Sequence, residues 1–193
     1  MNFRMTRARL ATGAVSAAVA GALAVSASPA SASAAGGYVN GGGSFYDDFA
    51  DEGTLSTTSY KDTNATCLWQ IILYAEGVKE SDGTQFDWAD IDGKYGSNTA
   101  YATKQLQKAW GLTQDGKVGN KTFGAADDKW NSTTGAGELE YRSTGSTDAT
   151  KYKLRYHGSR YYFDIYRTTN GKYRFYHKNV WQYASYKNNS SCS

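Results

Sequence analysis

Residues 92–99 read Asp-Gly-Lys-Tyr-Gly-Ser-Asn-Thr and residues 115–122 read Asp-Gly-Lys-Val-Gly-Asn-Lys-Thr, so one pattern occurs twice, 23 residues apart. In each copy the Asp can cap a turn, both glycines tolerate a positive φ, and the last Thr falls in the first turn of a following helix. We expect the residue before the second glycine, Tyr95 or Val118, to enter a hydrophobic core. Two such elements would hold short helices in place.

Helical patterns flank both copies. Asn64 is a suitable N-cap, apolar residues follow it at three- and four-residue spacing, and Gly77 is a C-terminal stop signal. A second helix is predicted over residues 97–111 and a shorter third helix over residues 120–130. Helices this short are not stable alone in water, so they must pack against one another.

The octapeptides and their flanking helices resemble the small three-helix peptidoglycan-binding domain that bacteria attach to secreted cell-wall enzymes. The resemblance covers residues 64–131 and also rests on Thr66, Trp69-Gln70, Leu73, Gly77, Leu106-Gln107 and Gly111-Leu112. It implies a helical domain at residues 63–131 whose partner is peptidoglycan, recognised through the wall glycan and its stem peptides. The residues expected to bind peptidoglycan are Trp88, Asp92, Tyr95, Asn98 and Tyr101.

The chain departs from this family pattern in its core and in one loop. Thr66 and Trp69 stand where an aliphatic pair is usual, and Thr103 stands where Val is common. The connection over residues 78–91 is longer than usual and carries Trp88, which either stacks on a sugar ring or lies flat on the domain as filler.

Acidic residues cluster around the same loop and raise the alternative of a calcium site: these are Asp82, Asp87, Asp90 and Asp92. Their spacing lacks the regular order of ligands with a closing Glu that a calcium loop requires. The sequence therefore predicts no metal and no cofactor.

The first 34 residues are typical of a secretory signal peptide. Arg4, Arg7 and Arg9 precede a stretch rich in Ala, Val and Gly, and small residues then offer cleavage sites. We expect no transmembrane segment, because spanning takes ~20 strongly apolar residues. Residues 35–62 form a leader, in which the Gly/Ser-rich residues 35–44 are expected to be flexible and the acidic residues 45–62 either wrap the first domain or stay loose. The chain is expected to be secreted, and extracellular or associated with the cell wall.

Charge divides the chain after the signal peptide into two halves. Residues 35–135 hold 8 Lys and 14 acidic residues, a balance of −6, whereas residues 136–193 hold 10 basic and 4 acidic residues, a balance of +6. Either the halves attract and dock, or the basic half binds an anionic polymer such as teichoic acid, and the two are compatible. Nucleic acid is the less favoured ligand.

The two cysteines of the chain, Cys67 and Cys192, are expected to form a disulfide. An even number of cysteines in an exported chain favours pairing, because the compartment is oxidising. The bond would tie the first helix to the C-terminus. The alternative is two unpaired thiols.

Alternating apolar and polar residues over 136–193 predict an antiparallel sheet of four or five strands, which makes the fold class α+β. A two-residue turn at residues 158–159 would set Tyr156 opposite Tyr161 and keep the apolar residues on one face. The other face is basic and Tyr-bearing, and its expected contacts to an anionic polymer are Lys153, Arg155, Tyr162, Tyr166 and Arg174. This module resembles no family that we recognise.

A second hairpin is predicted around residues 169–171. A two-residue loop there would put the apolar faces out of step, whereas a three-residue loop with Gly171 in a left-handed conformation sets Ile165 opposite Phe175. The bulged form is therefore expected.

Residues suited to catalysis are few, and none is assigned a catalytic role. His157 and His177 occur without the clustered His and Asp ligands of zinc peptidases. Glu138 and Glu140 lie at the start of a predicted strand rather than in a predicted cleft. The sequence favours a secreted, non-catalytic protein that binds peptidoglycan. The alternatives are a cell-wall hydrolase whose catalytic module is the C-terminal one, and a secreted toxin or inhibitor addressed to the wall.

Overall fold

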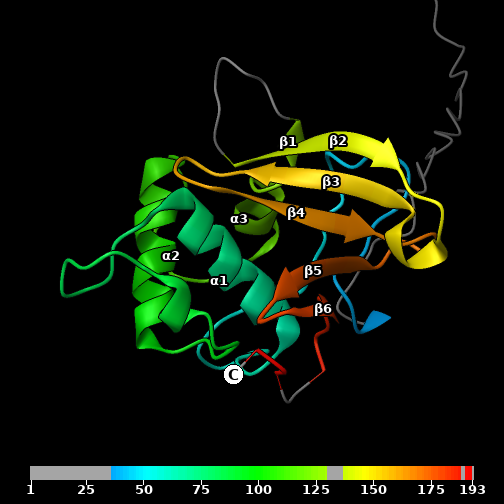
Figure 1. Cartoon of the computed structure of the whole chain (residues 1–193). Helices are drawn as coiled ribbons and strands as arrows, with labels where there is room; N and C mark the ends of the chain where they lie inside the picture. Colours follow the sequence, from blue (N-terminus) through cyan, green and yellow to red (C-terminus); the bar gives the residue numbers. More distant parts are fainter. Residues whose placement is uncertain (1–35, 130–136, 188–189, 193) are drawn as a thin grey trace, which may run out of the picture.

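The computed structural model describes residues 36–129, 137–187 and 190–192, and it places α-helices against one face of a β-sheet (Figure 1). The helices are α1 (Asn64–Glu76), α2 (Ser97–Ala109) and α3 (Asn120–Gly124), with short 3-10 turns η2 (Trp88–Asp90) and η3 (Asp148–Thr150). The strands are β1 (Asp128–Lys129), β2 (Glu138–Thr144), β3 (Tyr152–His157), β4 (Tyr162–Arg167), β5 (Tyr173–His177) and β6 (Val180–Tyr183).

The sheet has the order β1-β2-β3-β4-β5-β6. Strands β2 to β6 form a five-stranded antiparallel meander, as the alternating pattern predicted. The short strand β1 adds a parallel pairing at the edge beside β2. The α+β fold class is confirmed.

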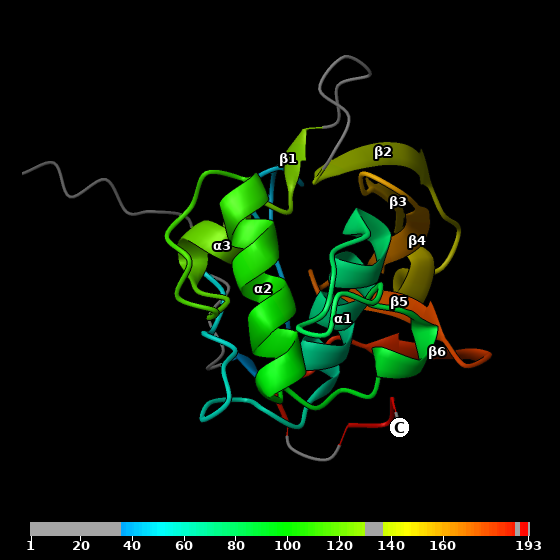
Figure 2. The same ribbon diagram turned by 90° about the vertical axis from the view of Figure 1, so that its left-hand side faces the viewer.

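Helix α1 is the centre of the molecule. Eleven of its 13 residues are buried, and Figure 2 shows it between α2 and the sheet. A helix that is buried on nearly all sides needs cover from more than one element. One continuous hydrophobic core accordingly contains Leu68 and Ile72 of α1, Leu106 of α2, and Tyr156 and Phe175 of the sheet.

The ends of α1 agree with the predicted boundaries except at the N-cap. Thr63, rather than Asn64, is the capping residue, because its Oγ1 accepts a hydrogen bond from the Thr66 amide at 3.1 Å. Asn64 is the first helical residue, and its side chain accepts a hydrogen bond from the Ser191 amide near the C-terminus. Gly77 ends the helix with φ 68°, as expected of a left-handed C-cap.

Helix α3 is shorter than predicted. It ends at Gly124, and the prediction that it continues to residue 130 is wrong over residues 125–129; Trp130 lies outside the described residues. The chain leaves the helix because Asp127 accepts a hydrogen bond from the Phe49 amide at 2.6 Å and Asp128 begins the parallel pairing with β2. A tertiary contact therefore sets the end of the third helix, and the local periodicity of the sequence does not predict that contact.

The predicted register of the β3–β4 hairpin is wrong by two residues. Tyr156 lies opposite Phe163, not Tyr161, because the turn is formed by residues 159–160. The amides of Arg160 and Tyr161 both donate to the Ala75 carbonyl at 3.0 Å, so the last turn of α1 sets the position of this turn. A shift of two residues keeps the same side chains facing inward, so the predicted apolar face survives.

The β4–β5 connection is confirmed as the three-residue, bulged form. Ile165 lies opposite Phe175, and Gly171 has φ 86°. A Cβ at Gly171 would lie 2.3 Å from the Gly41 carbonyl oxygen, so the position also requires glycine for space.

The segment predicted as a leader packs on the rest of the fold over its described part, residues 36–62. The Val39 amide donates to Ala184 at 2.7 Å, and Val39 accepts from the Tyr173 amide at 2.9 Å. Val39, Phe49 and Leu55 are fully or almost fully buried. Of the two alternatives for the acidic part of the leader, wrapping is the one observed. The prediction that the Gly/Ser-rich part is a flexible leader is wrong at Val39, which is buried and paired with the sheet.

Candidate functional site

The two octapeptides are held by two equivalent glutamine side chains. Gln70 Nε2 lies 2.9 Å from Asp92 Oδ1, 3.1 Å from the Lys94 carbonyl and 3.2 Å from Thr99 Oγ1. Its Oε1 accepts from the Asp92 and Gly93 amides. Each Asp-Gly turn is therefore fastened to the preceding helix and to the start of the next one.

Gln107 repeats this arrangement in the second copy. Its Nε2 lies 2.8 Å from Asp115 Oδ1, 2.9 Å from the Lys117 carbonyl and 3.0 Å from Thr122 Oγ1, and its Oε1 accepts from the Gly116 amide. Most of the repeated residues thus have a structural role. The predicted burial of Tyr95 and Val118 is confirmed.

Two of the departures from the family pattern, Trp69 and Thr103, contact each other. Trp69 Nε1 donates to Thr103 Oγ1 at 2.9 Å, and the Tyr95 hydroxyl lies at the same distance from that oxygen. Thr66 donates to the Tyr60 carbonyl at 2.7 Å. Three polar replacements in the core are therefore hydrogen-bonded, which removes the cost of burying them.

Residues 55–62 run alongside both octapeptides, a feature that the sequence analysis missed. Leu55 exchanges two backbone hydrogen bonds with Val118, and the Lys61 carbonyl accepts from the Tyr95 amide at 2.6 Å. Nothing in the composition of this segment indicates a strand-like pairing. Its position adds Thr57, Lys61 and Asp62 to the surface beside the first octapeptide.

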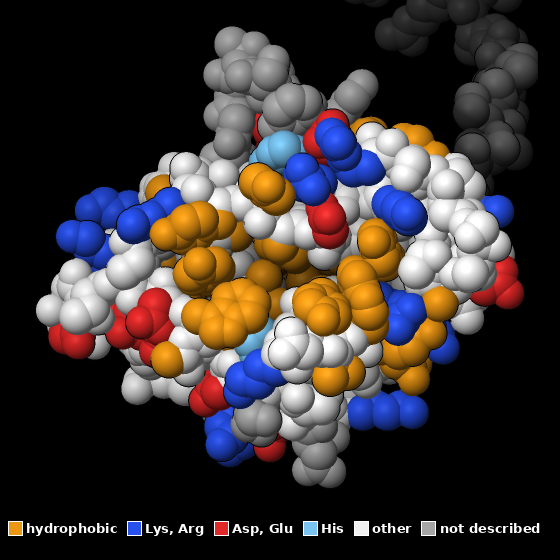
Figure 3. Space-filling view, viewed as in Figure 1, with side chains coloured by type: hydrophobic (Ala, Val, Ile, Leu, Met, Phe, Trp, Pro, Cys, Tyr) orange, Lys and Arg blue, Asp and Glu red, His pale blue; other side chains and the backbone are white. Residues whose placement is uncertain are grey.

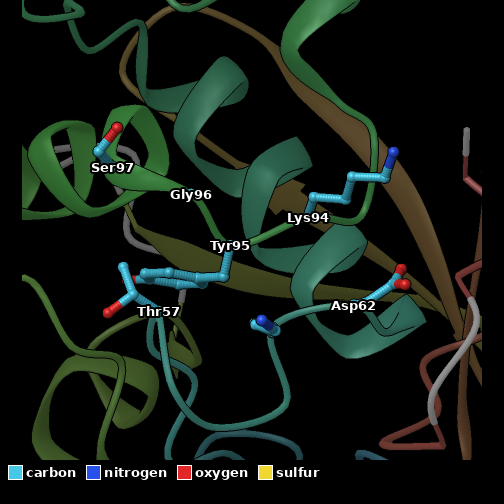
Figure 4. A pocket seen from close by; sticks show the side chains of 7 residues that line it. Thr57, Asp62, Lys94, Tyr95, Gly96 and Ser97 are labelled. Atoms are coloured by element: carbon cyan, nitrogen blue, oxygen red, sulfur yellow. The ribbon is translucent and has the colours of Figure 1, made fainter.

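A pocket of about 400 Å³ lies where this segment meets the start of α2 (Figure 4). Its lining consists of Thr57, Lys61, Asp62, Lys94, Tyr95, Gly96 and Ser97. Figure 4 shows the ring of Tyr95 directed toward Thr57. Two lysines and the first turn of α2 bring positive charge to this pocket, because Gly96 is an N-cap without a side-chain hydrogen bond and the helix dipole is positive at that end.

Tyr95 supports this pocket from within the core. Its hydroxyl lies 3.0 Å from the Gly116 carbonyl in the second octapeptide, besides its contact with Thr103. Burial raises the pKa of Tyr95, so its hydroxyl stays neutral. The residue joins the two octapeptides and presents its ring to the pocket.

A second pocket, of about 500 Å³, lies on the neighbouring side of the α2 N-terminus. It is lined by Glu80, Ser81, Asp82, Ser97, Asn98 and Tyr101, so Ser97 borders both pockets. Asn98 donates to Glu80, and Tyr101 is 37% exposed. The structure therefore brings together two of the predicted binding residues, Asn98 and Tyr101.

The remaining two predicted residues lie apart from these pockets. Asp92 is engaged in its own turn, where Oδ1 accepts from the Lys94 amide at 2.8 Å. Trp88 belongs to η2 and packs against Tyr74 and His177, with ring centroids 5.7 and 4.8 Å away. It lines neither pocket, and 46% of it is exposed.

The five residues of the predicted anionic-polymer face do share one face of the sheet, as the register predicts: they are Lys153, Arg155, Tyr162, Tyr166 and Arg174. Arg155 lies opposite Asp164 and donates to that carboxylate at 2.8 Å. Its guanidinium also lies 4.2 Å from the Tyr162 ring centroid.

The predicted disulfide is present between Cys67 and Cys192, with a Cα–Cα distance of 6.2 Å. His177 lies beside it, and its side chain is fully buried. These three residues are the group with metal-ligand geometry among the described residues, with ligand atoms within 4.8 Å of one another. Because the two sulfurs are bonded to each other, they are not thiolate ligands.

The acids of the proposed calcium alternative have other partners. Asp87 and Asp90 form a capping box around η2, with Asp90 accepting from the Asp87 amide at 2.7 Å. Asp82 accepts from the hydroxyl of Thr84 at 2.6 Å. These contacts explain the cluster through local turns.

The carboxylates and imidazoles considered for catalysis are spread over several places. Glu140 lies 2.9 Å from His157 Nε2 and 2.8 Å from Arg142 on the sheet. Two other acids are buried in the core: burial raises the pKa of Glu52 and of Asp127 to about 8. Glu52 accepts from Tyr186 at 2.8 Å, and Asp127 from the Phe49 amide.

Comparison with known proteins identifies one segment of the chain. Residues 70–125 match the family described as "Putative peptidoglycan binding domain", in agreement with the resemblance inferred from the octapeptides. The match supports peptidoglycan binding in general terms. No curated protein and no solved structure matches the chain. In the described part of the chain, the helices are too short or too polar to traverse a bilayer.

Proposed function

We propose that this chain is a secreted protein that binds peptidoglycan without cleaving it, and that the two pockets at the start of α2 hold the stem peptide. The observation that carries the proposal is the coincidence of two features. The segment 70–125 matches peptidoglycan-binding domains, and both pockets surround Ser97 within that segment.

The first pocket suits a carboxylate group. Lys61 and Lys94 are exposed and line it, and the first turn of α2, whose N-cap Gly96 makes no side-chain hydrogen bond, borders it with the positive end of the helix dipole. Asp62 also lines it and limits its positive charge, which favours a single carboxylate over a polyanion. Stem peptides offer carboxylates of this kind.

The adjoining pocket has the opposite character. Glu80 and Asp82 line it together with the amide of Asn98 and the ring of Tyr101. Such a lining suits amine and amide groups. One peptide could therefore cross Ser97 with a carboxylate on one side and a nitrogen-bearing group on the other.

Two features support the non-catalytic part of the proposal. A cysteine nucleophile needs a free thiolate, and both cysteines are used in the disulfide. Glu52 and Asp127, the acids whose pKa burial raises to about 8, are 2% and 0% exposed, so they are shielded from a wall polymer. Secretion is supported by the signal-peptide pattern of residues 1–34.

The peptide pocket is tested with a soluble muropeptide and two charge-matched double variants. Lys61→Gln with Lys94→Gln should weaken binding about tenfold, because charge-assisted contacts to the carboxylate are lost. Lys104→Gln with Lys108→Gln removes the same charge from exposed positions of α2 and should leave the affinity unchanged. Amidation of the peptide carboxylate should mimic the first variant. Equal affinity of both double variants would contradict the proposal.

A further inference from the structure

Strands β4 and β5 separate on the side of the molecule nearest α1. They pair over three residue pairs, from Arg167–Tyr173 to Ile165–Phe175, whereas β3 and β4 pair over six. The start of β4 and the end of β5 therefore diverge. Figure 3 shows a hollow near the middle of this face, surrounded by hydrophobic side chains.

Two runs of aromatic ring contacts, together called the circuit, flank this divergence. On one side, Tyr161 before β4 stacks on Tyr74 of α1 at 4.7 Å, Tyr74 meets Trp88 of η2, and Trp88 meets His177 at the end of β5. Tyr176 precedes His177 in β5, lies on the outer face of the sheet and begins the second run.

The other side of the circuit crosses three strands. Tyr176 packs against Trp181 of β6 with ring centroids 5.3 Å apart, and Trp181 stacks on Tyr166 of β4 at 4.4 Å. The rings thus begin beside the start of β4 and return to its middle. Each ring is held by a neighbouring ring, so little side-chain entropy would be lost on binding a ligand.

Three of the rings in the circuit are more exposed to solvent than residues of a hydrophobic core. Trp88 is 46% exposed, Tyr176 is 47% exposed and Tyr161 is 39% exposed. Exposed aromatic rings beside a hollow are characteristic of a ligand site rather than of core filling.

The arginines on this face are committed to intramolecular contacts. Arg155 is paired with Asp164, as described above. The Arg174 guanidinium lies over the Tyr183 ring at 4.9 Å and donates to the Ala149 carbonyl at 3.3 Å. A polyanion would have to displace these partners, whereas the faces of the rings need no rearrangement.

We propose that this aromatic hollow binds the sugar rings of the peptidoglycan glycan strand by stacking. The inference rests on the proposed function, and continuity with the matched segment supports it: Trp88 lies inside residues 70–125 and is also a member of the circuit. The hollow takes the glycan, while the pockets at the start of α2 take the peptide. Sugar rings present apolar C–H faces to aromatic rings and hydroxyls to the Tyr edges.

The test uses the full mature chain and a tetramer of β-1,4-linked N-acetylglucosamine, which carries no peptide and no charge. Binding is followed by tryptophan fluorescence and by chemical-shift changes. Trp88→Ala and Tyr176→Ala should each weaken binding about threefold to tenfold, whereas Trp88→Phe should restore most of the affinity. Tyr141→Ala removes an exposed tyrosine of β2 outside the circuit and should have no effect.

Salt and teichoic acid separate stacking from charge attraction. Affinity for the tetramer should change little between about 50 and 500 mM salt. Absence of tetramer binding by the native protein, or binding to teichoic acid alone, would overturn the inference. If sacculi bind and the tetramer does not, the proposed function stands and the glycan site fails. If the tetramer binds and sacculi do not, the hollow is a sugar site, but the proposed peptidoglycan binding fails and with it the assignment of the hollow to the wall glycan.

Discussion

Gln70 donates a hydrogen bond from Nε2 to Asp92 Oδ1 over 2.9 Å, and this contact fixes the first octapeptide to α1. The second octapeptide has the same contact between Gln107 and Asp115 at 2.8 Å. Because the pocket residues Lys94 and Ser97 belong to the first octapeptide, the glutamine positions the candidate site without contacting a ligand.

Replacement of Gln107 should show how much such a contact stabilises the fold. Gln107→Ala removes one side chain with four hydrogen-bond partners and leaves the Gly116 amide buried without its acceptor. The expected cost is about 2 kcal/mol or more, which corresponds to a fall in Tm of roughly 4–8 °C. Gln105→Ala, on the same helix but outside the network, is the control. Similar melting of the two variants would refute the structural role.

Stability should fall as the pH rises. The folded-state pKa values of Glu52 and Asp127 are raised to about 8 by burial, above their ordinary values of 4.5 and 3.8. The folded state therefore holds protons that the unfolded state releases, and this stabilisation is lost as the pH rises toward and through about 8.

Calorimetry at pH values from about 5 to 9 checks this dependence. Glu52→Gln with Asp127→Asn should flatten it and should be more stable than the native chain at the alkaline end. His177 acts in the opposite sense, because burial lowers its pKa and its contribution is lost on acidification. A native Tm that rises with pH over this range would contradict the assignment.

Loss of the disulfide should destabilise the fold but spare the pockets. The bond between Cys67 and Cys192 closes a loop of 125 residues, for which chain entropy gives about 4–5 kcal/mol. The double Ser variant should melt at a lower temperature, yet bind muropeptide normally below its Tm, because neither cysteine lines a pocket. Unchanged thermal stability would show that the C-terminus is held by other contacts.

Residues 63–131 should not fold when produced alone. The Tyr156 hydroxyl donates to the carboxylate of Glu76 at 2.6 Å, and Phe49 packs on Phe123 with centroids 4.9 Å apart. Removal of both flanking segments would expose α1, which is buried on nearly all sides. Circular dichroism should show little helix in the isolated segment and one cooperative transition in the mature chain. A cooperative melt of the isolated segment would contradict the shared core.

Local signals explain what could be predicted from the sequence. Gly77 and Gly171 adopt positive φ where their positions in a helix end and a bulged loop require it. The octapeptides indicated both a turn chemistry and a family. The alternation of the C-terminal residues placed Leu154 and Tyr156 on the inner face correctly.

Tertiary contacts explain what could not be predicted. The turn at residues 159–160 takes its position from the Ala75 carbonyl, and the end of α3 is fixed by Phe49. The pocket at the start of α2 includes Lys61, which reaches it through a backbone contact with Tyr95. Each of these contacts joins segments that are distant in the sequence, and no pattern within one segment predicts its contact with the other.

Incubation of the mature protein with purified sacculi tests the central claim most directly, with pelleted protein and released muropeptides measured in the same tubes. We predict that the protein sediments with the sacculi and that no fragments appear above the buffer control. Protein that stays in the supernatant would contradict peptidoglycan binding, and new muropeptides or reducing ends would contradict its non-catalytic character.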